Sequence, residues 1–389
     1  MGGVSLVTLA WCVAVVTEGV AWWDASWMPM SSHTLLLASC IVLIGAHASL
    51  PQASQEVETL GHEEAMALPL VAFGGLAALF IAYRFVDAAT LNALLRVYFV
   101  AVGTFACGEA VRPFLPRAWF RGAPIVDVVL PVVGELRGTV GDGVGVAIGA
   151  VVAGTYGVTG HWLANNAVAA GLCVSGLAQL LTNRYATAAA ILAGLFVYDI
   201  VMVYGTPMML DVATKVDGPI KLVLPRGGLD ARGAPAAGLL GLGDIIVPGL
   251  LLSLVLRFDT FRALRAGALP PPPAASPADA RAALPDTPFP RPLFLAGWLA
   301  YMVGLLITLV VMFLWEAGQP ALFFLVPCVL LATAGGAAVR GELRALLTYT
   351  DDGYVTELDT VCGVIHDGSA PPPPPPAADG TAAPHPKEE

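Results

Sequence analysis

Two aspartates stand alone in long uncharged stretches of the sequence. Asp199 is the only charged residue in 186–205, and Asp244 is the only one in 235–256. A helix needs about twenty apolar residues to cross the hydrocarbon core of a bilayer. A carboxylate in such a helix costs about 2.5–3.5 kcal/mol on the insertion scale, and intramembrane carboxylates are therefore expected to have a function. Acid–base catalysis or proton relay is the chemistry that this pair could do.

The two aspartates belong to consecutive spans, which run antiparallel, so their depths can be compared from the shared loop. Along a helix, Asp199 precedes Gly205 by about 9 Å and Asp244 follows Pro235 by about 13 Å. The two carboxyl groups are therefore expected at a similar depth, within contact. Two close carboxyl groups do not ionise together easily, so one keeps its proton while the other acts as a base. Aspartic proteases use this arrangement.

A proton-coupled transporter or a leak channel would use the same aspartates as relay groups. From Asp199 and Asp244 alone, transport is the better interpretation, because transporters far outnumber intramembrane proteases. Only the motifs around the two aspartates can change this balance.

The chain that positions the aspartates has the composition of a membrane protein. Of its 389 residues, 57% are hydrophobic and 12% are charged, whereas a soluble domain has about 25% charged residues. The apolar runs are continuous and do not alternate, which indicates helices and not barrel strands. We therefore predict an all-α, polytopic membrane protein with about nine transmembrane helices. The predicted spans are 33–50, 66–83, 89–111, 142–159, 162–181, 186–205, 235–256, 292–314 and 319–339.

Composition also excludes some kinds of partner. The net charge is −10 and the basic residues form no cluster, so no nucleic-acid partner is expected. The six cysteines lie far apart without a CxxC motif, so we predict neither a metal site nor a disulfide framework.

Both ends of the chain are predicted to lie outside the helical domain. Residues 1–30 form an N-terminal segment; residues 1–21 are either a cleaved signal peptide or an extra span, and we favour cleavage. Residues 31–350 form the nine-helix domain, with a proline-rich cytosolic loop at 270–292. Residues 351–389, which include six consecutive prolines, are predicted to be a disordered cytosolic tail.

The distribution of basic residues predicts the orientation of the chain. With nine spans and a lumenal N-terminus, thirteen of the nineteen Lys and Arg residues fall on the cytosolic side and six on the lumenal side. Because cytosolic loops are enriched in Lys and Arg, this split predicts a cytosolic C-terminus.

Three short motifs occur in order along the chain: YD at 198–199, GLGD at 241–244 and QPAL at 319–322. They resemble the three signatures of the GxGD intramembrane aspartyl proteases, the family of presenilin and the signal peptide peptidases. The stretches HWLANN, GPIKLVLP, LLLSLVLRFD and QPALFFLVP look more like the signal peptide peptidase branch than like presenilin. Three motifs in order on nine spans favour a protease over a transporter.

The resemblance implies that Asp199 and Asp244 are the catalytic pair and that no metal or organic cofactor is needed. It implies substrates within the lipid bilayer, namely signal-peptide remnants and type II membrane proteins, and a location in the endoplasmic reticulum membrane. The oligomeric state stays open, a homo-oligomer included. The residues that the resemblance implies around the active site and the substrate are Tyr198, Gly241, Leu242, Gly243, Pro320, Ala321 and Leu322.

Three other features are given structural predictions. Gly241 and Gly243 lack side chains where a second backbone is expected to approach Asp244. HWLANN at 161–166 lies at the entrance of a span, where interfacial anchoring or helix capping is expected. IKLVL at 220–224 is expected to be either a surface loop or an extended edge that pairs with unwound substrate by strand addition.

The predicted orientation can be tested by glycosylation mapping. A sequon engineered into 206–232 should be glycosylated, because this loop is predicted to be lumenal. A sequon in 270–292 should stay unmodified. A glycosidase-sensitive shift in gel mobility reports the outcome, and the opposite pattern would mean that the orientation is inverted.

Overall fold

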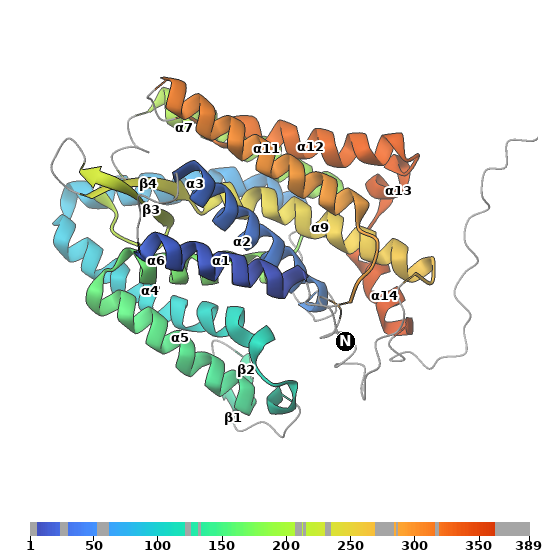
Figure 1. Ribbon diagram of the computed structural model, residues 1–389, viewed down its shortest axis with the longest axis horizontal. Coiled ribbons are helices and arrows are strands. Elements are labelled where there is room, and N and C mark those ends of the chain that lie inside the picture. The colour runs from blue at the N-terminus through green and yellow to red at the C-terminus, as the bar shows by residue number, and fades with distance from the viewer. Residues whose placement is uncertain are drawn as a thin grey trace, which may run out of the picture.

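The computed structural model is a bundle of long helices with two short hairpins (Figure 1). It describes residues 6–23, 30–52, 62–120, 126–130, 134–206, 212, 215–229, 235–268, 284, 287–315 and 319–361. Most of the proline-rich loop and all of the segment after 361 lie outside these residues.

Helices account for every predicted span except the first part of the seventh. The long helices are α1 (Leu6–Trp23), α2 (Met30–Gln52), α3 (His62–Phe85), α4 (Ala88–Val111), α5 (Val140–Thr159), α6 (Trp162–Gln179), α7 (Tyr185–Gly205), α9 (Gly243–Arg265), α11 (Pro292–Trp315) and α12 (Leu322–Val339). Two short helices, α13 (Leu343–Thr348) and α14 (Asp351–Val361), follow. The all-α, polytopic prediction is confirmed.

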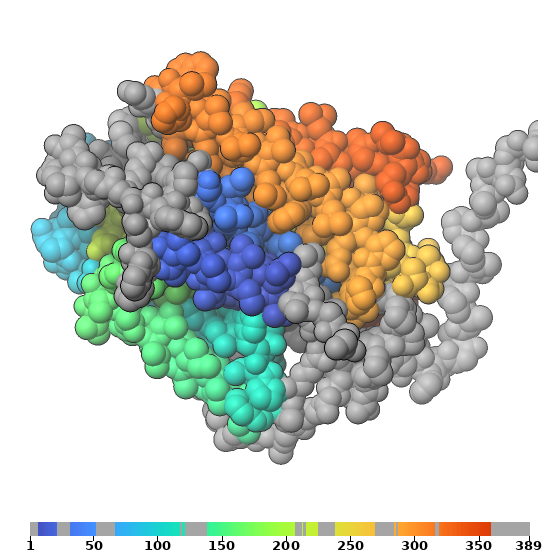
Figure 2. Space-filling view, in the orientation of Figure 1, coloured from blue at the N-terminus to red at the C-terminus, as the bar shows by residue number. Residues whose placement is uncertain are grey.

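The exact number of spans stays a prediction. Among the described residues, seven helices are long and apolar enough to cross a membrane: α2, α3, α4, α5, α7, α11 and α12. The helices α6 and α9, which were also predicted as spans, do not belong to this set. In α9, several charged residues lie towards the end of the helix. The N-terminal helix α1 packs along α2, and Figure 2 shows it across the middle of one face.

The helix α9 lies at the centre of the bundle. It packs against α2, α6, α7, α11, α12 and α14. Nearly all of its side chains from Ile245 to Leu264 are buried. Because α9 contacts so many other helices, the residues at its start are held in a fixed place relative to most of the molecule.

Small residues bring α4 and α5 into close contact. The buried face of α5 carries Gly141, Gly145, Gly149 and Ala153, one per turn. A Cβ on Gly149 would clash with the main-chain oxygen of Thr104 in α4. Small residues at this spacing thus allow the close packing of two helices.

The prediction for the seventh span is wrong in its first part. Residues 235–241 do not start a helix but form strand β4 (Pro235–Gly241), which pairs antiparallel with β3 (Lys221–Leu229). Pairing with β3 gives the main chain of this apolar run hydrogen bonds on one side, in place of those of a helix. The helix begins only at Gly243, and Asp244 therefore lies in the first turn of α9 and not deep within a span. A second hairpin pairs β1 (Val126–Leu130) with β2 (Gly134–Gly138).

The predicted tail also begins differently. Its first residues form α14, which packs on α9, while 362–389 lie outside the described residues. The reason is a buried ion pair: Arg257 Nε donates to Asp351 Oδ1 at 3.1 Å, and its Nη2 lies 3.0 Å from Asp351 Oδ2. The same guanidinium donates to Ser49 Oγ at 3.2 Å and to the main-chain oxygen of Thr182 at 3.1 Å. The start of α14 is thus fixed to α9, α2 and the loop before α7.

Removing the charge of Asp351 should destabilise the fold. Asp351→Leu leaves the Arg257 guanidinium buried without its counter-charge, which typically costs about 3–5 kcal/mol. Thermal unfolding of the detergent-solubilised protein would measure this loss. Asp352→Leu is the matched control, since the neighbouring carboxylate is exposed; equal loss in both variants would contradict the role of the ion pair.

Candidate active site

Asp199 is held by the start of a helix that is distant in the sequence. It lies on α7, is only 7% exposed, and its Oδ2 accepts the main-chain N–H of Leu322 at 3.0 Å. Leu322 is the first residue of α12, and the N–H groups at the start of a helix have no partner within it. One carboxylate oxygen is thus fixed by a main-chain donor.

Two further contacts join α7 to the QPAL segment. Tyr204 donates its hydroxyl hydrogen to Gln319 Oε1 at 2.6 Å. Phe196 stacks on Phe323 with ring centroids 5.8 Å apart. The predicted residues Pro320, Ala321 and Leu322 are all buried here. The structure therefore brings QPAL and Asp199 together.

Asp244 lies at the start of the helix that packs against the helix of Asp199. The two helices are α9 and α7. Asp244 is partly exposed, whereas Tyr198, beside Asp199 on α7, is half-buried against the core. The positive end of the α9 dipole favours a carboxylate in its first turn.

The glycines beside Asp244 have no side chains, so the space next to this residue is not filled. A Cβ on Gly241 would lie 3.5 Å from Asp244 Oδ2, which is an ordinary contact, and a Cβ on Gly243 would meet no described atom within 4 Å. The second backbone that was expected here does not come from the described part of this chain. The open space beside Asp244 is available to another molecule.

The hairpin β3–β4 leads directly into the GLGD motif. Lys221 pairs with Gly241 and Val223 with Leu239, and Leu242 N–H donates to the main-chain oxygen of Ile220 at 3.1 Å. The predicted extended edge at 220–224 is thus a strand, and β4 occupies one of its sides.

The other side of β3 is occupied too, by a pair of residues whose role the sequence analysis missed. His161 caps α6, since its Nδ1 accepts the N–H of Leu163 at 3.2 Å. Asn165 and Asn166 do not cap: both are buried and hydrogen-bond to the main chain of β3. The anchoring-or-capping prediction is wrong for these two, and so is the idea that β3 has a free edge for substrate. Two adjacent amides within an apolar helix were the available signal, because buried amides need partners.

The free edge of the hairpin belongs to β4. Because the main-chain groups of Val223 point to Asn166, the pair Val223–Leu239 does not exchange hydrogen bonds. In such an antiparallel pair the N–H and C=O groups of both residues point outward. The outward groups of Leu239 and Gly241 have no hydrogen-bond partner among the described residues. This edge ends at Asp244.

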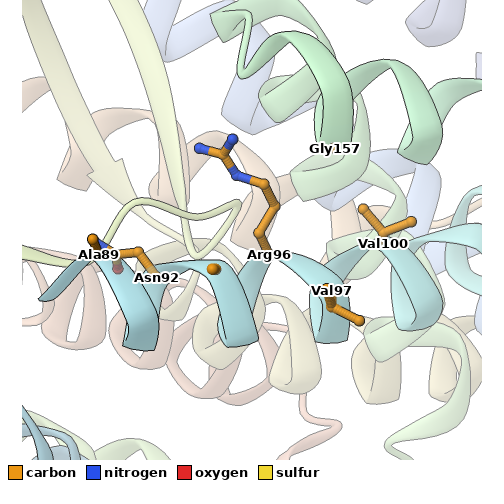
Figure 3. A pocket seen from close by; sticks show the side chains of 7 residues that line it. Ala89, Asn92, Arg96, Val97, Val100 and Gly157 are labelled. Carbon is orange, nitrogen blue, oxygen red and sulfur yellow. The ribbon is translucent and has the colours of Figure 1, made fainter. Parts of the chain in front are cut away.

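A groove on α4 is separate from this site. It has a volume of about 550 Å³ and is lined by Ala89, Asn92, Ala93, Arg96, Val97, Val100 and Gly157. Figure 3 shows Arg96 rising from α4 between Asn92 and Val100. Its guanidinium is paired with Asp217 at 2.8 Å. None of the predicted site residues lines this groove.

Comparison with known proteins gives one consistent result. The family model of signal peptide peptidase matches residues 52–353, which include both aspartates and QPAL. Signal peptide peptidase of Homo sapiens is 28% identical over 334 residues, 82% of each chain. Intramembrane protease 2 of Caenorhabditis elegans is 37% identical over 199 residues, which are 50% of this chain and 40% of the relative. Signal peptide peptidase-like 1 of Oryza sativa subsp. japonica is 31% identical over 240 residues, 52% of this chain and 60% of the relative.

Proposed function

The chain belongs to the signal peptide peptidase family, and on that premise we propose that it is an intramembrane aspartyl protease with Asp199 and Asp244 as its catalytic pair. The observation that carries the proposal is that two carboxyl groups lie on helices packed against each other, one held by Leu322 N–H and the other beside open space. Residues near these carboxyl groups would shape the surroundings of the substrate: Tyr198, Gly241, Leu242, Gly243, Pro320 and Ala321.

The reaction needs one proton shared between the pair. The ionised carboxyl group takes a proton from water, and the water oxygen bonds to the substrate carbonyl carbon while the protonated carboxyl group donates to the carbonyl oxygen. The tetrahedral intermediate then loses the amide nitrogen, which receives a proton as the C–N bond breaks. Leu322 N–H engages Oδ2 of Asp199, and Oδ1 would be the oxygen that acts on the water.

We propose transmembrane segments as substrates, in particular signal-peptide remnants and type II membrane proteins. The names of the relatives support this class. A helical substrate shields its peptide bonds with its own hydrogen bonds, so it has to unwind before cleavage. The outward main-chain groups of Leu239 and Gly241 suit an unwound segment, which would add as a strand beside β4 and run past Asp244.

The proposal extends to the setting of the enzyme. The protein is a multi-pass membrane protein, as its apolar helices and its family show. We propose the endoplasmic reticulum membrane, with a cytosolic C-terminus on the count of basic residues. Assembly into a homo-oligomer is compatible with this proposal, which does not depend on it.

Neither aspartate should work without the other. Asp199→Asn and Asp244→Asn should each lower the cleavage of a signal-peptide substrate by about ten-thousandfold or more, because residues that act as a unit lose their effect together. The double variant should be no worse than either single one. Purified protein and a single substrate peptide, analysed by mass spectrometry, give the measurement.

The same assay separates the protease from a transporter. Wild-type activity should fall at low pH, where both carboxyl groups are protonated, and at high pH, where both are ionised. An aspartyl-protease transition-state analogue should label the wild type. A proton-relay transporter would bind no such analogue and would change no peptide. Substantial proteolysis by either single variant would falsify the shared-proton mechanism.

The free edge of β4 should be needed for substrate but not for the catalytic pair. Leu239→Pro removes one outward N–H, and an edge strand tolerates proline when its N–H points outward. Cleavage should fall by about tenfold, the effect of one main-chain hydrogen bond, while analogue labelling persists. Leu239→Ala keeps the N–H and should retain more activity; equal activity in Leu239→Pro and the wild type would exclude strand addition at β4.

A further inference from the structure

Two neighbouring asparagines on α6 are buried in the bundle. The side chains of Asn165 and Asn166 are 5% and 2% exposed. A buried primary amide requires hydrogen-bond partners for two donor hydrogens and one oxygen. Where those partners lie shows what the two residues do.

The side chain of Asn166 forms two hydrogen bonds with the main chain of β3, as a neighbouring strand would. Its Oδ1 accepts the N–H of Val223 at 2.7 Å, and its Nδ2 donates to the main-chain oxygen of the same residue at 2.8 Å. Asn165 Nδ2 donates to the main-chain oxygen of Lys221 at 2.9 Å. Together the two amides close the edge of β3 that β4 does not cover.

The second donor hydrogen of Asn166 points to the N-terminal helix. Its Nδ2 lies 3.2 Å from Oε1 of Glu18 on α1, and His33 Nε2 lies 3.5 Å from the same oxygen. A flipped amide would turn its oxygen towards the Glu18 carboxylate and the Val223 oxygen, which both accept hydrogens. Val223 and Glu18 therefore favour the same orientation of the Asn166 amide, the one in which it fits β3.

The contact continues from β3 to the catalytic pair. Lys221, which Asn165 binds, pairs with Gly241 of GLGD. Ile220, the residue before it, accepts the N–H of Leu242 at 3.1 Å. Asp244 follows two residues later. Any displacement of β3 therefore moves the start of α9 and the free edge of β4 together.

We propose that Asn166, supported by Asn165 and by Glu18 of α1, is a positioning residue that sets the β3–β4 hairpin, and through it the place of Asp244 and the alignment of substrate along β4. The proposal rests on the proposed protease function. It also makes α1 a working part of the enzyme, so that this helix remains attached to the mature chain, contrary to the cleavage favoured from the sequence.

The position of the cleaved bond distinguishes a positioning role of Asn166 from a purely structural role. A purely structural role would leave that position unchanged. Asn166→Ala leaves the Val223 N–H and oxygen without partners, and we expect total cleavage to fall by about tenfold to a hundredfold. The remaining products should be cut at bonds displaced from the wild-type site, because the hairpin is no longer held in one place. Labelling by the transition-state analogue should persist. Mass spectrometry of the products of one signal-peptide substrate gives the rates and sites together.

Conservative and control variants isolate the contact. Glu18→Leu removes the acceptor and should reproduce the displaced cleavage in weaker form, whereas Glu18→Gln keeps an oxygen acceptor and should restore the wild-type site. Ser175→Ala changes a polar residue on the same helix that bonds only to Gln179 in the described residues, and should leave cleavage unchanged. The intact mass of the purified protein should include α1.

Each outcome decides the matter. A wild type that neither cleaves nor binds the analogue contradicts the proposed function itself. An active wild type with Asn166→Ala cutting the same bonds at the same rate overturns the positioning role. Joint loss of labelling and thermal stability in Asn166→Ala would show that this variant has unfolded. If that variant does not fold, the pair of Glu18 variants decides: equal effects of Gln and Leu, or a mature chain without α1, reject the proposal.

Discussion

Main-chain hydrogen bonding is the constraint from which this structure can be understood. In a bilayer an unpaired N–H or C=O group costs several kcal/mol, so each segment needs an internal solution. Each helix pairs its main-chain N–H and C=O groups with hydrogen bonds of its own. Residues 235–241 do not, and on one side they take their partners from β3, which in turn is bound at Lys221 and Val223 by two side chains of α6. The proposed active site lies where this pairing ends and α9 begins.

Much of the bundle could be predicted because hydropathy reports burial in lipid directly. Each predicted span contains a helix, although the seventh begins in a strand, and the packing of the two aspartate-bearing helices against each other agrees with the antiparallel course of consecutive spans. The hairpin was missed because a short apolar run such as 235–241 is compatible with both a helix and a buried strand. Only a partner strand decides between them, and the pairing of β3 is not visible in the composition of β4.

The polar contacts between distant segments could not be predicted for a different reason. Leu322 binds Asp199 across 123 positions of the sequence, and Asn166 binds Val223 across 57. In both cases one partner is a main-chain group, which every residue possesses, so residue type carries no information about it. Arg257 and Asp351 are similar: opposite charges are common near the ends of spans, and which two meet depends on how α9 and α14 pack.

The main-chain donor at Leu322 has a consequence for which substitutions this position tolerates. Any amino acid except proline supplies the same N–H, so the hydrogen bond to Asp199 does not depend on the leucine side chain. That side chain is only 5% exposed and packs in the core, so its volume and polarity are constrained separately. Another apolar residue of similar volume keeps both the packing and the hydrogen bond, whereas proline removes the donor.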